Sequence, residues 1–295
     1  MNPATLDRLL WRTSKQAPPH KQTVVVSTDT AQLRIRDSGS SKPMVVFLCD
    51  PPVTIEAYDE VISLFEPDYR VVVIELPGFG FTKPSSSKAC EFSATVISIE
   101  SAIAQLNPQS LVICGPCIGG FVATELVHRA NLDIDGIVLM QVPDTLGMLA
   151  WTEGMDPKGR LRTRYIGQMI VRRAANGLTK FWFKFATAKE NDHSRLTKIT
   201  LQALSIGARY PLATMLQKWP KQLKDMNLEI PALVIWGKQD RSHNKTDPRS
   251  TLKHVQDAEI IELENCGHFS ELEKPEEFHN AVLPFIHSCT RQADA

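Results

Sequence analysis

The chain has 295 residues, of which 43% are hydrophobic and 22% are charged, a composition typical of a soluble globular protein. Its net charge of zero argues against a general nucleic-acid binder, and no uncharged apolar stretch reaches the ~18 residues that a membrane-spanning helix needs. We therefore expect neither nucleic acid nor membrane as a partner. The first 15 residues mix charges with apolar positions, unlike a secretory signal, so we expect a cytoplasmic protein with reduced cysteines.

Short β-branched runs alternate with longer helical patterns along most of the chain, which predicts a mostly parallel sheet with helices on its faces. Eight strands are expected, at residues 22–27, 33–36, 44–48, 71–75, 111–114, 136–140, 232–236 and 259–263. Helices are expected where apolar residues recur at helical spacing, at residues 55–65, 93–106, 118–129, 245–254 and 275–287.

This alternation stops near Thr145 and resumes near Pro231. We therefore predict an N-terminal extension (1–21), a core (22–144 and 227–295) and an inserted helical lid (145–226). Residues 151–224 carry 15 Lys or Arg residues and four acidic residues, a balance of +11, which the rest of the chain offsets with −11. The lid is thus expected to be a basic surface over the sheet.

A nucleophile motif follows the fifth expected strand. Residues 111–120 read LVICGPCIGG, an apolar strand that runs into Gly-x-Cys-x-Gly and then into a helix. Such a sharp turn strains the backbone of its central residue, and glycines two residues to either side avoid collisions with neighbouring elements. We predict that Cys117 is a nucleophile whose thiol pKa is lowered by the start of the helix. The alternative is a buried structural cysteine.

Further segments follow in the order found in the α/β-hydrolase superfamily, which the chain resembles over about residues 23–288. LPGFGF contains the Pro-Gly-x-Gly turn, LVIWGKQD ends at Asp240, and ENCGHF contains His268. The resemblance implies an α/β-hydrolase fold and a triad in which His268 takes the proton of Cys117 while Asp240 fixes the histidine tautomer. Asp144 is a second position from which the acid is supplied in some members. Six other histidines, at 128, 193, 243, 254, 279 and 287, are expected to be solvated.

One segment departs from the superfamily pattern. Most members have His-Gly after the third strand, followed by a residue whose backbone N–H forms half of the oxyanion hole, whereas residues 49–52 here read CDPP. Proline has no N–H to donate. We expect Ile118 to supply the first donor and Val53, in a shifted loop, to supply the second if one exists. Because a lost donor typically slows such reactions ~10²-fold, an activated thioester is the favoured substrate.

A cysteine nucleophile also bears on the type of reaction, because moving an acyl group from one thiol to another is nearly thermoneutral. The triad and the chain size resemble those of the cysteine-type aminoacyl transferases that shuttle amino acids between carrier proteins in nonribosomal peptide pathways. The resemblance implies a substrate carried on the phosphopantetheine arm of an acidic acyl or peptidyl carrier protein, or on coenzyme A, and no bound cofactor or metal. Lid residues Arg160, Arg162 and Arg164 are the candidate contacts with the carrier.

Two other functions remain open from the sequence. A thioesterase or esterase would use the same Cys117 triad but pass the acyl group to water. A catalytically silent binding protein on a hydrolase scaffold is suggested by the two prolines where an oxyanion donor is usual. Acyl transfer between carrier proteins is the leading hypothesis.

Overall fold

The computed structural model describes residues 2–11, 17 and 19–293. Its strands join in one sheet, with bounds β1 (Thr23–Ser27), β2 (Ala31–Asp37), β3 (Met44–Leu48), β4 (Arg70–Ile74), β5 (Lys83–Pro84), β6 (Leu111–Pro116), β7 (Gly136–Met140), β8 (Ala232–Gly237) and β9 (Glu259–Leu263). The strand order is β1-β2-β4-β3-β6-β7-β8-β9, with β5 paired to β2. Pairing is parallel from β4 through β9, whereas β1, β4 and β5 pair with β2 in the antiparallel sense.

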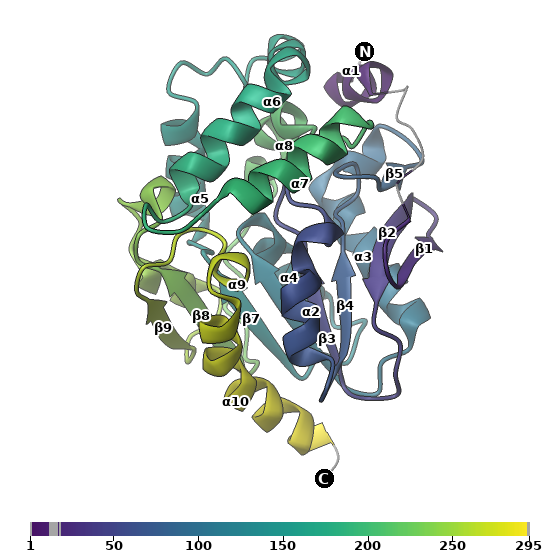
Figure 1. The fold of residues 1–295 in the computed structure, drawn as a ribbon, viewed down its shortest axis with the longest axis vertical. Coiled ribbons are helices and arrows are strands. Elements are labelled where there is room, and N and C mark those ends of the chain that lie inside the picture. Colours follow the sequence, from purple (N-terminus) through teal and green to yellow (C-terminus); the bar gives the residue numbers. More distant parts are fainter. Residues whose placement is uncertain (1, 12–16, 18, 294–295) are drawn as a thin grey trace.

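Helices cover both faces of this sheet (Figure 1), which explains why β3, β6 and β7 are buried along their whole length. On one face, α3 (Phe92–Leu106) and α4 (Ile118–Arg129) pack in a core that includes Val46 and Ile113. On the other face, α2 (Asp59–Phe65) and α10 (Pro275–Ala293) pack in a core that includes Phe47. The parallel strands are therefore packed between two apolar layers. The loops at the carboxyl ends of these strands are where functional residues are expected.

The described residues also form several shorter helices. These are α1 (Pro3–Leu10), α9 (Ser270–Glu273) and five 3₁₀ helices, η1 (Ile55–Tyr58), η2 (Lys88–Cys90), η3 (Trp219–Lys221), η4 (Arg241–His243) and η5 (Pro248–Lys253). No helix among the described residues is both long enough and apolar enough to cross a membrane.

The predicted sheet is confirmed, and the ends of the predicted strands fall within two residues of the observed ends. The structure adds the two-residue strand β5, which is too short to show an alternating pattern in sequence. The α-helix predicted at residues 245–254 is wrong, because this segment forms only η5, a 3₁₀ helix of six residues. Asp247 and Pro248 start η5, and Leu252 is its only large apolar residue, so no apolar stripe holds a longer helix against the core.

Four helices lie between β7 and β8 in sequence, and we call them the lid helices: α5 (Thr145–Met155), α6 (Ile166–Ala186), α7 (Ser194–Ser205) and α8 (Leu212–Lys218). They lie over the end of the sheet at which the parallel strands finish (Figure 1). In α6, Val171, Ala175, Thr179 and Trp182 are buried at helical spacing, so one stripe of this long helix faces the rest of the protein. The predicted boundaries of the lid at residues 145 and 226 stay a prediction.

Helix α1 packs on the lid helices α6 and α8. Asp7 is buried and accepts a hydrogen bond from the Thr214 hydroxyl of α8. The Arg172 guanidinium of α6 lies 4.9 Å from the centre of the Trp11 ring. Within the predicted N-terminal extension (1–21), residues 12–16 and 18 lie outside the described residues. The described part of this extension therefore adds a polar anchor and a cation–π contact to the outer side of the lid.

Replacing Asp7 with asparagine should stabilise the protein at alkaline pH. Burial raises the pKa of Asp7 to about 6 from 3.8, although the bond from Thr214 partly opposes the shift. The folded state therefore binds this proton more tightly than the unfolded chain, and the resulting stability is present below pH 3.8 and lost as pH rises through about 6. We expect Asp7→Asn to raise the free energy of unfolding by about 1–3 kcal/mol at pH 8. The gain should be smaller at pH 5, as measured by urea unfolding.

The exposed Asp29 offers a matched control for this measurement. Asp29→Asn makes the same change of charge on the surface and should leave the unfolding free energy nearly equal to that of the native protein at both pH values. A loss of stability in Asp7→Asn that is the same at pH 5 and pH 8 would contradict the prediction.

Candidate active site

Cys117 occupies the turn between β6 and α4, as the motif predicts. Its backbone has φ 45° and ψ −114°, a conformation that residues with a side chain rarely adopt and that costs of order 1–3 kcal/mol. Its N–H donates to the Met140 carbonyl of β7 over 2.7 Å, which holds the turn against the sheet. A Cβ at Gly115 would lie 2.7 Å from both the Gly119 carbonyl oxygen and the Gly120 Cα. Only glycine fits there, so the requirement for a small residue comes from the close approach of strand and helix.

Asp240 and His268, in the loops after β8 and β9, are in direct contact. His268 Nδ1 lies 2.6 Å from Asp240 Oδ2. The same carboxylate accepts hydrogen bonds from Gln141 Nε2 at 2.7 Å and from the Ser242 N–H and hydroxyl at 2.8 and 2.7 Å. Burial opposes ionisation of Asp240, but the charge and hydrogen bond of His268 outweigh it and hold the pKa of Asp240 well below its usual range. The structure thus gives His268 an ionised partner at Nδ1.

Asp144, the alternative acid, makes its contacts with Gly147 and Lys253. Its side chain accepts a hydrogen bond from the Gly147 N–H at 2.7 Å and so caps α5. Its other oxygen lies 2.5 Å from Lys253 Nζ. Of the two acids considered from the sequence, Asp240 is therefore the one in contact with His268.

Two histidines expected to be solvated are buried. The His243 ring stacks on the His268 ring, with centroids 5.5 Å apart and planes inclined by 12°. Burial lowers the pKa of His243 to about 4, so this ring is neutral at physiological pH. His254 is also buried, with Nε2 3.0 Å from the Pro143 carbonyl oxygen. The expectation was wrong because the segment after β8 folds inward against the site instead of running over the surface.

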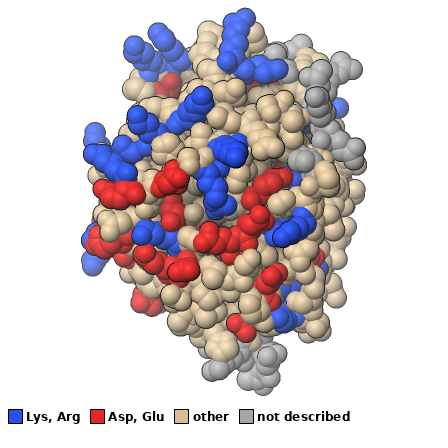
Figure 2. Space-filling model, viewed as in Figure 1, with Lys and Arg blue, Asp and Glu red and all other residues tan. Residues whose placement is uncertain are grey.

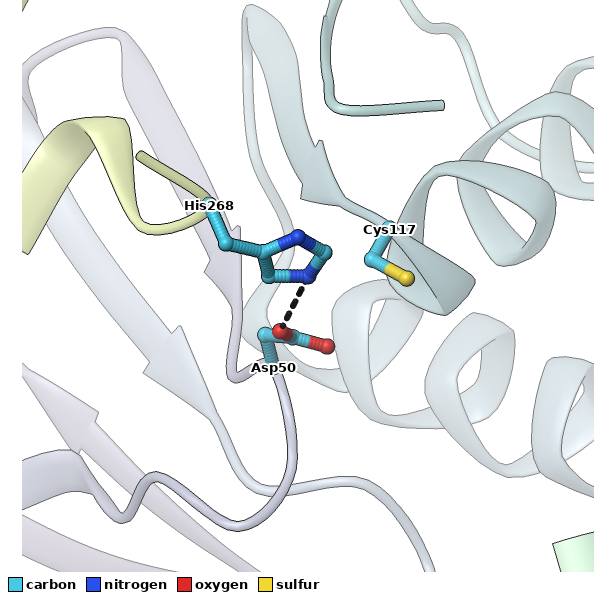
Figure 3. A group of neighbouring side chains, drawn as sticks. All are labelled: Asp50, Cys117 and His268. Atoms are coloured by element: carbon cyan, nitrogen blue, oxygen red, sulfur yellow. Dashed lines mark ion pairs between the residues drawn. The ribbon is translucent and has the colours of Figure 1, made fainter. Parts of the chain in front are cut away.

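Asp50 is a site residue that the sequence reasoning did not assign. It follows β3 and reaches the opposite side of the imidazole from Asp240, with Oδ2 3.2 Å from His268 Nε2 (Figure 3). Its side chain is only 5% exposed, and the Asp50 carboxylate, the Cys117 sulfur and the His268 ring each have a ligand atom within 4.8 Å of the others. An acidic residue two positions after the end of a buried parallel strand is the signal that would have drawn attention to it.

The charges around His268 determine which groups are ionised. Burial alone would lower the pKa of His268, but the charge of Asp240, together with hydrogen bonds to Asp240, Asp50 and Cys117, raises it well above the usual range. Burial raises the pKa of the Cys117 thiol, and the charge of Asp50 raises it further, whereas His268 lowers it. The predicted lowering of the thiol pKa is therefore wrong, because burial and Asp50 outweigh the start of α4. The charge and hydrogen bond of His268 are therefore what favours the Cys117 thiolate.

The two predicted oxyanion donors differ in their surroundings. Ile118 is the first residue of α4, directly after Cys117, and its N–H lowers the pKa of the neighbouring thiol, so it points toward the sulfur. The Val53 N–H donates to the Asp50 carbonyl oxygen at 2.9 Å within its own turn. The expectation that Val53 supplies the second donor is therefore wrong, because its N–H is already used.

An apolar cavity of about 100 Å³ opens beside Cys117, His268 and Asp50. Most of its wall comes from apolar side chains of the lid helices and the segments that join them, namely Met148, Trp151, Met155, Leu161, Leu178, Phe181, Trp182, Leu212, Met215 and Leu216. The Trp182 ring also meets the His268 ring edge to face, with centroids 5.0 Å apart. This cavity suits an apolar group bound next to the thiol.

The candidate carrier contacts lie in the segment between α5 and α6. Arg160 and Arg164 are exposed, and the Arg164 guanidinium lies 4.9 Å from the centre of the Tyr165 ring. Arg162 is held within the protein, because its backbone N–H and its Nη2 donate to the Asp156 side chain and carbonyl at 2.9 and 3.0 Å. Lys and Arg side chains gather over the lid, and acidic side chains gather below it (Figure 2). Their role toward a carrier protein stays a prediction.

Among the residues that the structure describes, two sets of side chains are spaced closely enough to hold a metal ion. One is Asp50, Cys117 and His268, and the other is Asp240, His243 and His268. The Nδ1 of His268 already contacts Asp240, so only the first set offers a ring nitrogen that faces the cavity. That no metal is bound stays a prediction from the sequence.

Comparison with known proteins gives the family. Residues 45–281 match the family described as the Alpha/beta hydrolase family. The chain belongs to this family. This alpha/beta hydrolase has the fold of Bacillus megaterium epoxide hydrolase, with TM-score 0.71 and 17% identity over 90% of this chain and 100% of that chain. Est816, named as an N-acyl homoserine lactone degrading enzyme, gives TM-score 0.70 and 18% identity over 89% and 100% of the two chains. The predicted fold class is confirmed.

Two relatives found by sequence are named as a hydrolase and an esterase. The alpha/beta hydrolase is 23% identical over 272 residues to the 2-hydroxy-6-oxononadienedioate/2-hydroxy-6-oxononatrienedioate hydrolase of Klebsiella pneumoniae, which covers 87% of this chain and 91% of the relative. It is also 23% identical over 229 residues to the pimeloyl-(acyl-carrier protein) methyl ester esterase of Nitrosospira multiformis. This alignment covers 74% of this chain and 84% of the relative. These names favour the predicted alternative, a hydrolase, over the leading prediction of transfer between carrier proteins.

Proposed function

We propose that this alpha/beta hydrolase cleaves an ester or thioester of an apolar acyl group through a covalent thioester on Cys117. The observation that carries the proposal is the 2.6 Å contact of His268 Nδ1 with Asp240, on a ring whose other nitrogen faces the cavity that Cys117 lines. A nucleophile, a base and a group that orients the base are the parts that covalent acyl transfer requires.

The proposed reaction starts from a Cys117 thiolate beside a protonated His268, the state in which the thiol proton is on His268 Nε2. The sulfur then attacks the substrate carbonyl carbon, and the resulting imidazolium protonates the leaving group as the carbon–leaving-group bond breaks. Asp240 holds Nδ1 protonated, so Nε2 is the nitrogen that exchanges the proton. A water molecule activated by His268 then hydrolyses the acyl thioester and restores the free thiol.

Hydrolysis is favoured as the second step because relatives named as hydrolases and as an esterase align over most of the chain. Transfer to a second thiol is the other candidate, and the mostly apolar cavity favours it, since few polar groups there would hold a water molecule against the acyl group. The relative named for an acyl-carrier-protein ester also supports a carrier-bound substrate, with the phosphopantetheine arm as part of it.

The test uses a short acyl thioester of N-acetylcysteamine. Intact-protein mass spectrometry should detect one acyl group per chain, and peptide mapping should place it on Cys117. Chasing the acyl-enzyme with buffer or with a holo carrier protein then measures free acid against acylated carrier. Acid as the main product in both chases supports the hydrolase, and acylated carrier supports the transferase. Acylation elsewhere than on Cys117 would exclude both.

Charge reversal on the lid tests a carrier protein as partner. Arg160→Glu combined with Arg164→Glu should weaken binding of an acidic carrier, because the carrier loses two attractive charges and meets two repulsive ones. We expect a rise in Kd of roughly tenfold at low salt and less at high salt, measured by titration calorimetry. Arg162 is left unchanged because it holds the segment in place through Asp156.

Lys21→Glu combined with Lys42→Glu is the matched control, with the same change of charge on exposed residues that precede β1 and β3. The control should bind the carrier about as well as the native protein. Equal weakening in both double variants would show a general charge effect, and unchanged binding in the lid variant would remove the lid arginines from the interface.

A further inference from the structure

Three side chains of the types that bind zinc meet beside the cavity, and each comes from a different segment (Figure 3). They are Asp50 after β3, Cys117 before α4 and His268 after β9. One ligand atom from each lies within 4.8 Å of the others, and Asp50 Oδ2 is 3.2 Å from His268 Nε2. Apart from His268, Asp50 Oδ2 has no hydrogen-bonding partner among the described residues. The triad assigns no role to this buried carboxylate.

We propose that Asp50, Cys117 and His268 form a Zn²⁺ site, and that bound zinc reversibly inhibits the enzyme by occupying the sulfur and Nε2. Zinc is then an inhibitor and not a resident cofactor, because catalysis needs the same two atoms free. The inhibition rests on the proposed function, since it requires Cys117 to be the nucleophile, whereas zinc binding by itself does not.

The distances between the three side chains suit a tetrahedral zinc ion. Zn–N and Zn–O bonds of about 2.0–2.1 Å place a nitrogen and an oxygen ligand about 3.3 Å apart. The 3.2 Å between Asp50 Oδ2 and His268 Nε2 is close to this separation. With a Zn–S bond of about 2.3 Å, the Cys117 sulfur would lie about 3.5 Å from each, so it has to close by no more than about 1.3 Å. The fourth position is left for a water molecule in the cavity.

His268 already has the orientation that a zinc ligand needs. Metal-binding histidines almost always donate their other ring N–H to a carboxylate, a carbonyl group or water. Asp240 accepts this bond from Nδ1 at 2.6 Å, and Gln141 and Ser242 in turn donate to the Asp240 carboxylate. In the neutral ring the Nε2 lone pair is therefore available to the ion, in the same tautomer that the proposed reaction uses.

The charges of the site also favour a divalent cation. Asp50, Asp240 and the Cys117 thiolate carry three negative charges, and protonated His268 balances one of them. No lysine or arginine is among the described residues that line the cavity. When Zn²⁺ binds, the His268 proton is released to solvent, and the ion is neutralised by the thiolate and the Asp50 carboxylate. A buried pair of anions thus gains the counterion that the surrounding side chains do not supply.

Cobalt titration tests the ligands, because Co²⁺ occupies tetrahedral zinc sites and absorbs light. The native protein should bind one Co²⁺ with a thiolate-to-cobalt charge-transfer band, and Zn²⁺ should displace the cobalt and remove the band. Cys117→Ala should lack the band. Cys114→Ala is the matched control and should keep both the band and the zinc affinity, measured by competition with a chelator. A native protein without the band, or a band that persists in Cys117→Ala, would overturn the proposal.

Acid-to-amide substitutions separate the proposed site from the neighbouring set of Asp240, His243 and His268. Asp240→Asn should weaken zinc binding 10–100-fold, the usual cost of losing a partner of a ligating histidine. Asp50→Asn loses a direct ligand, so we expect a loss at least as large. Asp144→Asn is the control and should bind zinc as the native protein does. Zinc affinity that is lost in Asp240→Asn but kept in Asp50→Asn would place the ion in the other set and overturn the proposal.

Alkylation of the native protein by iodoacetamide measures the block without an acyl substrate, and it decides even if a variant does not fold. A stoichiometric amount of Zn²⁺ should slow alkylation of Cys117 strongly, and EDTA should restore the rate. Alkylation that is equally fast with zinc would overturn the proposal. If zinc protects Cys117 but the zinc-free protein forms no acyl adduct, the zinc site stands and the proposed function fails.

Discussion

Replacing Cys117 with alanine should abolish the acyl adduct and lower turnover by roughly 10⁶-fold, the scale of loss when a triad hydrolase loses its nucleophile. His268 and Asp240 would remain in contact at 2.6 Å, but the ring would have no thiol to deprotonate. Relief of the strained backbone does not compensate, because φ 45° at position 117 is set by the strand and helix on either side. Turnover of the acyl thioester and intact mass measure the two effects.

Cys114 provides the matched control, since it lies three residues earlier on β6 and is fully buried. Cys114→Ala removes one sulfur from the core beneath the site and should keep both the adduct and most of the turnover. A labelled adduct that persists in Cys117→Ala would show that another residue is the nucleophile, and the proposed mechanism would be abandoned.

Asparagine at position 240 should lower turnover by about 10⁴-fold, the effect of such a change in a Ser-His-Asp triad. The amide nitrogen would face His268 Nδ1 or force the ring into the tautomer with its proton on Nε2, so that Nε2 no longer accepts the proton of Cys117. The loss of the Asp240 charge would also lower the pKa of His268, because this charge is the largest influence that raises it. The native His268 ring stays protonated until it protonates the leaving group, whereas the ring in the Asp240→Asn variant loses its proton more readily.

Asp144→Asn carries the same change at the competing acid and should keep nearly native turnover. Its expected cost is in stability, through loss of the ion pair with Lys253 at 2.5 Å. Steady-state kinetics on both variants, with thermal unfolding as a check on folding, distinguish the two acids. Nearly native turnover in Asp240→Asn together with an inactive Asp144→Asn would reverse the assignment.

Several features of this protein could be read from neighbouring residues alone. The strand, glycine and helix signals around Cys117 lie within residues 111–129, and the structure has β6, the turn and α4 there. Asp240 follows the clear apolar run of β8 (ALVIWG), and His268 follows the more mixed strand β9 (EIIEL). The strand β5 was not predicted, because two residues are too few for a periodic pattern to stand out. The segment at residues 245–254 was predicted as an α-helix but forms only the six-residue 3₁₀ helix η5.

Properties that arise from several segments at once needed the fold. The thiol pKa was predicted from the helix start that follows Cys117, yet burial and Asp50 reverse its direction. The Val53 N–H appeared free in the sequence, although a bond within its own turn uses it. His243 appeared solvated because its neighbours are polar, but it stacks on His268 at 5.5 Å.

The sequence by itself determined the alternation of strands and helices, the strained turn at Cys117, and the order of nucleophile, acid and histidine, because each of these depends on residues close together in the chain. The tertiary structure alone decided that Asp50 contacts Nε2 of His268, the ring nitrogen opposite the one that contacts Asp240. The physical reason is the strand order, in which β3 lies beside β6 and the loops after β3, β6, β8 and β9 open at the same edge of the sheet. Side chains as far apart as residues 50 and 268 thereby share one buried space, and their charges set one another's protonation.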